Sequence, residues 1–98
     1  MLDQAIGIAL NQDWTYDFSN PYEAVEAWFR RDGRWPENLE LVIADIDRLF
    51  ETTPDAEARL APWVGTGLRV DEIDAFLAAM RKRAVDGLAG DPEPMRQP

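Results

Sequence analysis

The sequence predicts an all-α fold, a small bundle of four to five helices followed by a flexible C-terminal tail. Apolar side chains recur every three to four residues in five separate segments, which is the period of an amphipathic helix, and no segment alternates as a half-buried strand does. Pro, Gly and Asn residues fall between these segments, where helices begin and end. The 98 residues suit one domain. We therefore predict a helical domain over residues 1–86 and a tail over residues 87–98.

The first two predicted helices span residues 2–10 and 21–32, and the second carries strong boundary signals. Asn20 precedes it as an N-cap, and Glu23 follows three residues later, as a capping box requires. Gly33 is typical of the position just after a helix.

The remaining helices are predicted over residues 36–52, 54–63 and 71–85. The second of these follows Thr53 as a capping residue and carries a proline in its last turn, where a helix stops. The segment 87–98, with three Pro and two Gly, predicts a loose tail. The longest of the three helices supplies the central apolar face, formed by Leu39, Val42, Ile43, Ile46, Leu49 and Phe50.

The composition argues against an enzyme. The chain has no Cys and no His, which removes disulfides, thiolate metal sites and the commonest general base. No nucleophile, base and orienting group occur together in a recognisable pattern. Asp45, Asp47 and Glu51 are a conceivable oxygen site for a hydrated cation, but the spacing matches no known metal loop. We predict no catalytic residue, no cofactor and no metal.

The charge indicates the class of partner. The formal net charge is -9, from 19 acidic and 10 basic side chains. Such a surface repels nucleic acid and anionic membranes and attracts a basic protein, although acidity also serves solubility alone. Residues 1–10 lack the basic start of a signal peptide, and no apolar run approaches the ~20 residues of a membrane span. We therefore expect a cytoplasmic protein.

Three acids are predicted to line one flank of the helix over residues 36–52. Glu40, Asp47 and Glu51 share that flank, and only Arg48 is near enough to relieve them, whereas Glu26 on the preceding helix has Arg30 four residues later. A basic partner would relieve the repulsion and associate faster. We take the three acids as candidate contact residues. The alternative is a plain solvated face.

The stretch 11–18 is the most unusual in the chain, with two amides, two acids and three aromatics between two helices. Trp14 is either a binding hot spot or a core residue, and we favour the core, because large aromatics in small domains are needed inside. We expect Asp13 and Asp17 to be exposed and take them as interface candidates. Leu41 stands among acids and is either an interface anchor or an isolated exposed leucine.

Several short motifs follow one another over roughly residues 5–83. They are Asn11-Gln12-Asp13-Trp14 after an apolar helix, Asp17-Phe18, Ala24-Val25 with Phe29, Ile43-x-x-Ile46-Asp47-x-Leu49-Phe50, and Phe76-Leu77 in a late helix. In order and spacing they resemble the small immunity proteins of contact-dependent growth inhibition systems.

The resemblance implies a cytoplasmic antidote that binds and blocks a toxin domain delivered by a sibling cell. It brings no catalytic motif and transfers no contact residue, because immunity surfaces vary with their toxins. The toxins are commonly nucleases, whose clefts tend to be basic because they hold phosphates. We therefore expect a basic toxin domain as the partner and leave the oligomeric state open. The alternative is an acidic helical adaptor or regulatory module for another basic cytoplasmic protein.

Overall fold

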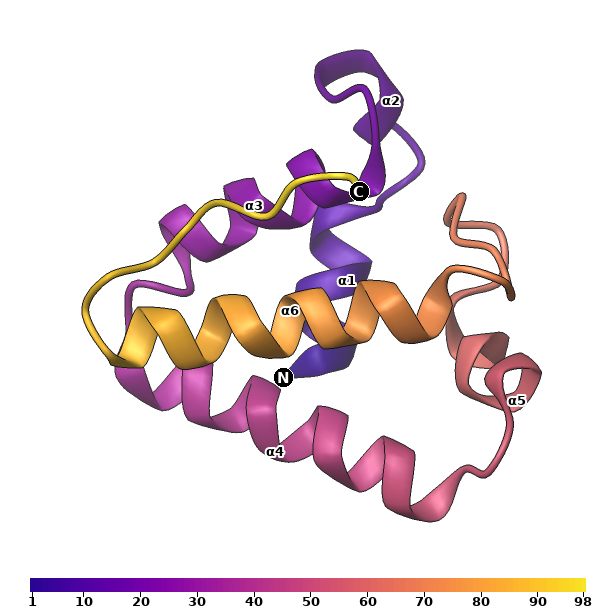
Figure 1. Ribbon diagram of the computed structural model, residues 1–98. Coiled ribbons are helices and arrows are strands. Elements are labelled where there is room, and N and C mark those ends of the chain that lie inside the picture. Colours follow the sequence, from indigo (N-terminus) through magenta and orange to yellow (C-terminus); the bar gives the residue numbers. More distant parts are fainter.

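The computed structural model describes all of residues 1–98 and contains helices but no strand (Figure 1). The all-α prediction is therefore confirmed, with one short helix, α2, that was not predicted. None of the helices combines the length and apolar character needed to cross a membrane. The elements are α1 (Leu2–Ala9), α2 (Trp14–Asp17), α3 (Pro21–Arg31), α4 (Pro36–Thr52), α5 (Ala56–Leu60), the 3₁₀ turn η1 (Ala61–Trp63) and α6 (Ile73–Leu88).

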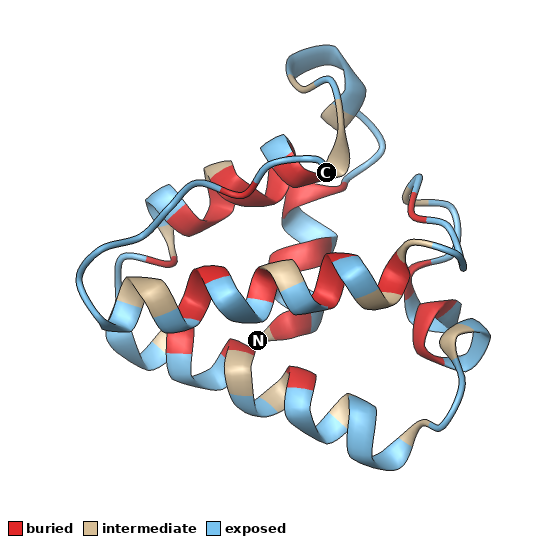
Figure 2. Cartoon of the chain, in the orientation of Figure 1, coloured by how far each residue is buried: buried red, intermediate tan, exposed pale blue.

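The long helices α4 and α6 lie side by side and run in opposite directions (Figure 1). Arg81 pairs with Asp47 near the middle, and Gly87 lies against Leu39 where α6 ends and α4 begins. Helix α1 contacts both α3 and α4, so it joins the two halves of the bundle. Buried residues face inward from α1, α3, α4 and α6 (Figure 2).

The core consists of 22 buried residues that come mainly from the predicted apolar faces. Phe29 and Phe76 are the largest fully buried side chains, and the Tyr22 ring meets Phe76 edge-on with 5.0 Å between centroids. Burial of each such side chain contributes roughly 1.5–3 kcal/mol. Phe50 departs from the prediction: it is 40% exposed, because its end of α4 extends past the core, and Arg59 lies 4.8 Å above its ring.

The predicted cap of α3 is confirmed, whereas the Glu23 side chain bonds the residue before the cap and not the cap residue that a capping box requires. The side chain of Asn20 accepts a hydrogen bond from the backbone N–H of Glu23 at 3.1 Å, and the Glu23 carboxylate accepts one from the backbone N–H of Ser19 at 3.1 Å. The first bond satisfies a backbone donor that the first turn of a helix leaves free, and the second holds the residue before the cap.

The predicted helix over residues 54–63 is shorter than expected. It begins after Asp55, whose side chain accepts a hydrogen bond from the N–H of Ala58 at 2.8 Å, so Asp55 and not Thr53 is the cap. The α-helix ends at Leu60 and continues as the turn η1. Pro62 lies in that turn and has no N–H for an α-helical hydrogen bond.

Helix α6 continues three residues beyond the predicted end, to Leu88. Gly90 ends it with a φ of 85°, a left-handed conformation that favours glycine. The N–H of Asp91 then bonds the carbonyl of Asp86 at 3.1 Å, and the N–H of Gly90 bonds Gly87 at 3.2 Å. This pair of bonds is the Schellman motif.

After Gly90 the chain turns back and runs along α3 and α6 without regular secondary structure, and the C-terminus lies near the start of α3 (Figure 1). The prediction of a loose tail is wrong at Met95, which is 6% exposed and belongs to the core cluster. Met95 packs with the core cluster, and its backbone N–H bonds the Glu26 carboxylate, a contact between residues 69 apart that no local sequence pattern predicts.

Candidate protein-binding site

The segment between α1 and α3 forms a projection at one end of the molecule (Figure 1). Its shape comes from local polar contacts. The Asn11 side chain donates to the carbonyl of Ile8 at 3.1 Å and accepts from the backbone N–H of Asp13 at 2.8 Å. Asparagine favours such turns because its side chain bonds nearby backbone groups. The turn directs the chain away from α1 and into the single turn of α2.

Trp14 connects α2 to the loop before α6 by a hydrogen bond and a packing contact. Its indole Nε1 donates a hydrogen bond to the carbonyl of Thr66 at 3.1 Å. Its ring lies so close to Gly67 that a Cβ there would come within 3.0 Å of the ring, and Gly67 has a φ of 92°. Trp14 is therefore not inside the core as predicted, but half-buried at its rim. The anchor holds the short helix in place.

Helix α2 presents an acid–aromatic–acid surface to solvent. Tyr16 is 85% exposed, the highest value among the exposed large hydrophobic residues. Asp13 and Asp17 are exposed, as predicted, and neither takes part in an ion pair. The exposure of Tyr16 was not predicted from the sequence. Helical spacing could have predicted this exposure. Tyr16 follows the inward-facing Trp14 by two residues, and residues two apart on a helix point to opposite sides.

A surface hollow of ≈ 430 Å³ lies beside α2. Its apolar lining includes Trp14, Phe18 and Trp28, and Asp13 and Asp17 also line it. The structure thus brings together two predicted contact residues and three aromatics from α2 and α3. Arg31, which bonds Asp32, also lines the hollow. Trp and Tyr are enriched among the residues that dominate protein-binding energy.

The acids of α4 form a separate group at the opposite end of the molecule from α2 (Figure 1). Glu40, Asp47 and Glu51 are all exposed, as the prediction requires. However, Arg81 on α6 bonds both carboxylate oxygens of Asp47, at 2.7 and 3.1 Å, and these hydrogen bonds hold the pKa of Asp47 below its ordinary value. The expectation that only Arg48 is near enough to relieve these acids is therefore wrong for Asp47.

The conceivable cation site on α4 is not assembled. Asp45 faces the start of α1, where one of its oxygens accepts hydrogen bonds from the N-terminal ammonium at 2.8 Å and from the backbone N–H of Leu2 at 3.0 Å. Burial alone would raise the pKa of Asp45, but these bonds outweigh it and lower the pKa. With Asp47 held by Arg81, the two carboxylates have different partners, and no group of three potential ligands is placed for a metal ion.

Glu26 has more partners than its sequence spacing indicates. It is 7% exposed, and it accepts the expected hydrogen bond from Arg30 at 3.2 Å. It also accepts two from Arg83 on α6, at 2.8 and 3.2 Å, and one from the backbone N–H of Met95 at 2.8 Å. Burial would raise the pKa of Glu26, yet the hydrogen bonds, led by those from Arg83, lower it. The cluster joins α3, α6 and the tail.

Comparison of the chain with protein-family models, with curated proteins and with solved structures finds no match. Membership of the immunity family therefore stays a prediction from the motifs.

Proposed function

We propose that the chain is an immunity-type protein that binds and neutralises a basic toxin domain, a nuclease, of a contact-dependent growth inhibition system. The observation that carries the proposal is the surface of α2. Asp13 and Asp17 are exposed acids without a basic partner, and Tyr16 between them is 85% exposed. Within the monomer these acids form no ion pair. A basic partner would compensate their charge and pack against the tyrosine ring.

The exposed Tyr16 between two unpaired acids favours α2 as the contact surface. On α4, Asp47 is paired with Arg81, whereas Glu40 and Glu51 form no ion pair, as Asp13 and Asp17 form none. A partner that approaches Asp47 competes with Arg81, which already occupies both of its oxygens. A partner that approaches Asp13 or Asp17 has no ion pair to break. The anchor from Trp14 to Thr66 also holds α2 before binding, which reduces the entropy lost on association.

Neutralisation would proceed by steric and electrostatic occlusion. The cleft of a nuclease carries basic residues for phosphate groups. A projecting, acidic helix is a suitable shape and charge to enter such a cleft and exclude the nucleic acid. The net charge of -9 would also accelerate the encounter at low salt. No reactive group of this chain is required.

The test is co-expression with the C-terminal domain encoded directly upstream. We expect that domain to arrest growth alone and the chain to restore growth. The double variant Asp13→Lys/Asp17→Lys should lose protection, whereas the matched variant Glu40→Lys/Glu51→Lys, with the same charge change at the other end, should keep it. Loss of protection only in the second variant would move the contact surface to α4. Toxicity without rescue by the unaltered chain would refute the immunity function and favour an adaptor.

A further inference from the structure

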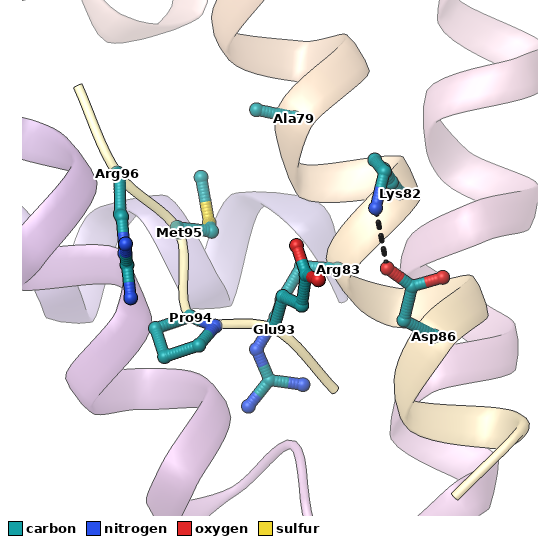
Figure 3. A pocket seen from close by; sticks show the side chains of 8 residues that line it. All are labelled: Ala79, Lys82, Arg83, Asp86, Glu93, Pro94, Met95 and Arg96. Carbon is teal, nitrogen blue, oxygen red and sulfur yellow. Dashed lines mark hydrogen bonds and ion pairs between the residues drawn. The ribbon is translucent and has the colours of Figure 1, made fainter. Parts of the chain in front are cut away.

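The tail occupies a groove between α3 and α6. Residues 91–98 have no regular secondary structure, and Met95 is the only one of them that is buried. Figure 3 shows the tail, with Glu93, Pro94, Met95 and Arg96, running beside α6, which carries Ala79, Lys82 and Arg83. The tail therefore packs against the helices as an extended segment.

Few contacts hold the tail. Beyond Asp91, the only hydrogen bond from the tail to the rest of the chain joins the backbone N–H of Met95 to the Glu26 carboxylate, at 2.8 Å. Glu93 and Arg96 form no ion pair. The attachment is thus one buried side chain and one backbone hydrogen bond.

The groove is wider than its present occupant. A hollow of ≈ 440 Å³ lies on the α6 side of the tail, beside Ala79 and Lys82, and one of ≈ 480 Å³ lies on the α3 side, beside Ala27 and Arg30. Pro94, Met95 and Arg96 line both hollows, so the two flank the same tail residues. A longer or bulkier segment would find unfilled space on each side.

The Glu26 carboxylate is held mainly by residues outside the tail. Of the four hydrogen bonds that it accepts, two come from Arg83 and one from Arg30, and only the fourth comes from Met95. The bonds from Arg83 and Arg30 orient the carboxylate as an acceptor for a backbone N–H. The small side chains of Ala27 and Ala79 leave room for an unbranched apolar chain, and Lys82 stands on the side of the groove where Glu93 lies.

We propose that the groove between α3 and α6 is a binding site for an extended partner segment, and that the tail is its internal, displaceable ligand. The segment would carry an unbranched apolar residue such as Met in the slot of Met95. It would place an acidic residue two positions earlier, as Glu93 is placed on the side of the groove that Lys82 lines. This mode combines backbone hydrogen bonding for affinity with a side-chain slot for specificity.

The occupant is a partner segment and not the tail of a second copy, because the chain's own tail is present at a higher effective concentration than the tail of another molecule. A tethered tail acts at an effective concentration on the order of millimolar. An identical tail from another molecule makes the same contacts and cannot compete at ordinary protein concentrations. A partner segment can compete, because it can fill the two flanking hollows as well.

The test uses a peptide of residues 91–98 with a fluorescent label, the full-length chain, and a truncated chain that ends at Asp91. We expect saturable binding to the truncated chain and binding weaker by at least about tenfold to the full-length chain, where the tethered tail competes. A peptide with Met95→Ala should not bind. The variant Asp13→Lys/Asp17→Lys in the truncated chain is the control, and it should bind the peptide normally because α2 is not part of the groove.

Three results would overturn the proposal: no binding to a truncated chain that keeps its helical circular dichroism, equal binding to both chains, or full binding by the Met95→Ala peptide. If the truncated chain does not fold, the full-length variant Met95→Ala is used in its place. The proposal then requires that this variant bind the wild-type peptide more tightly than the wild-type chain binds it. A dimer of the full-length chain in light scattering, absent in Met95→Ala, would identify tail exchange and refute the partner segment.

Discussion

The guanidinium of Arg83 on α6 lies against the carboxylate of Glu26 on α3, with Nε and Oε1 2.8 Å apart, and 5.0 Å above the ring of Phe29. Both charged side chains are almost fully buried, at 8% and 9% exposure. A buried pair of this kind fixes the relative position of two helices, because each charge is compensated only in one arrangement.

Removal of one member of this pair should be costly. Arg83→Met leaves the Glu26 carboxylate buried with Arg30 as its remaining basic partner, and we expect a loss of about 3–5 kcal/mol in the free energy of unfolding. Urea denaturation measures it. The double variant Glu26→Leu/Arg83→Met removes both charges and should be more stable than Arg83→Met alone. A double variant that is less stable than the single one would contradict this account of the pair.

The same cluster predicts how stability depends on pH. The pKa of Glu26 is lower in the folded chain than its ordinary value, because the hydrogen bonds from Arg83 and Met95 outweigh the effect of burial. A lowered folded pKa stabilises the fold above the unfolded pKa of about 4.3, and this stabilisation is lost as the pH falls through the folded pKa. We therefore expect the melting temperature to fall as the pH drops below the pKa of the Glu26 carboxyl group in the unfolded chain.

The variant Glu26→Gln isolates the contribution of this group. Asp45, Asp47 and Asp74 also have lowered pKa values, so some acid sensitivity should remain. Relative to the unaltered chain, the variant should have a lower melting temperature at pH 7 and a smaller decrease on acidification. Parallel melting curves against pH for the two proteins would show that Glu26 does not contribute.

Features that depend on neighbouring residues could be predicted from the sequence. The bounds of α4 agree with the prediction at both ends, and Asn20 caps α3 as expected. These features depend on spacings of three or four residues, where the physical rules are local. The helix over residues 54–63 was harder, because Thr53 and Asp55 are both capable caps and only the structure shows which one bonds a free N–H.

Contacts between distant residues could not be predicted in this way. The pairs Glu26 with Met95 and Trp14 with Thr66 are 69 and 52 residues apart in sequence, and no periodicity links their members. Tail burial depends on a slot that two helices form together. Exposure of Asp13 and Asp17 was foreseen from composition, whereas the exposure of Tyr16 follows only once α2 is known to be helical.

The ion pair between Asp47 and Arg81 should matter little for stability. Both side chains are about half exposed, at 50% and 45%, so water and salt screen the attraction. We expect Asp47→Asn to lower the melting temperature slightly, and the difference to shrink as sodium chloride is raised from low to molar concentration. A large decrease that persists at high salt would show that the pair positions α4 against α6.

Two glycines in one loop offer a matched test of how α2 is anchored. Gly65 and Gly67 have φ values of 91° and 92°, and a Cβ on Gly65 would meet nothing within 4 Å, whereas one on Gly67 would meet the Trp14 ring at 3.0 Å. Alanine at either position strains the backbone by about 1–2 kcal/mol. We expect Gly67→Ala to destabilise more than Gly65→Ala in urea denaturation, because only Gly67→Ala also displaces the indole.

The excess should depend on Trp14. In a Trp14→Ala background the ring is absent, and the two glycine variants should then cost the same free energy, since only the backbone term remains. The double-mutant cycle thus isolates the contact between Trp14 and Gly67 from the strain that both loop positions share. An excess for Gly67→Ala that persists without the ring would mean that the loop, and not the indole, determines the cost, and that Trp14 holds α2 through its hydrogen bond to Thr66 alone.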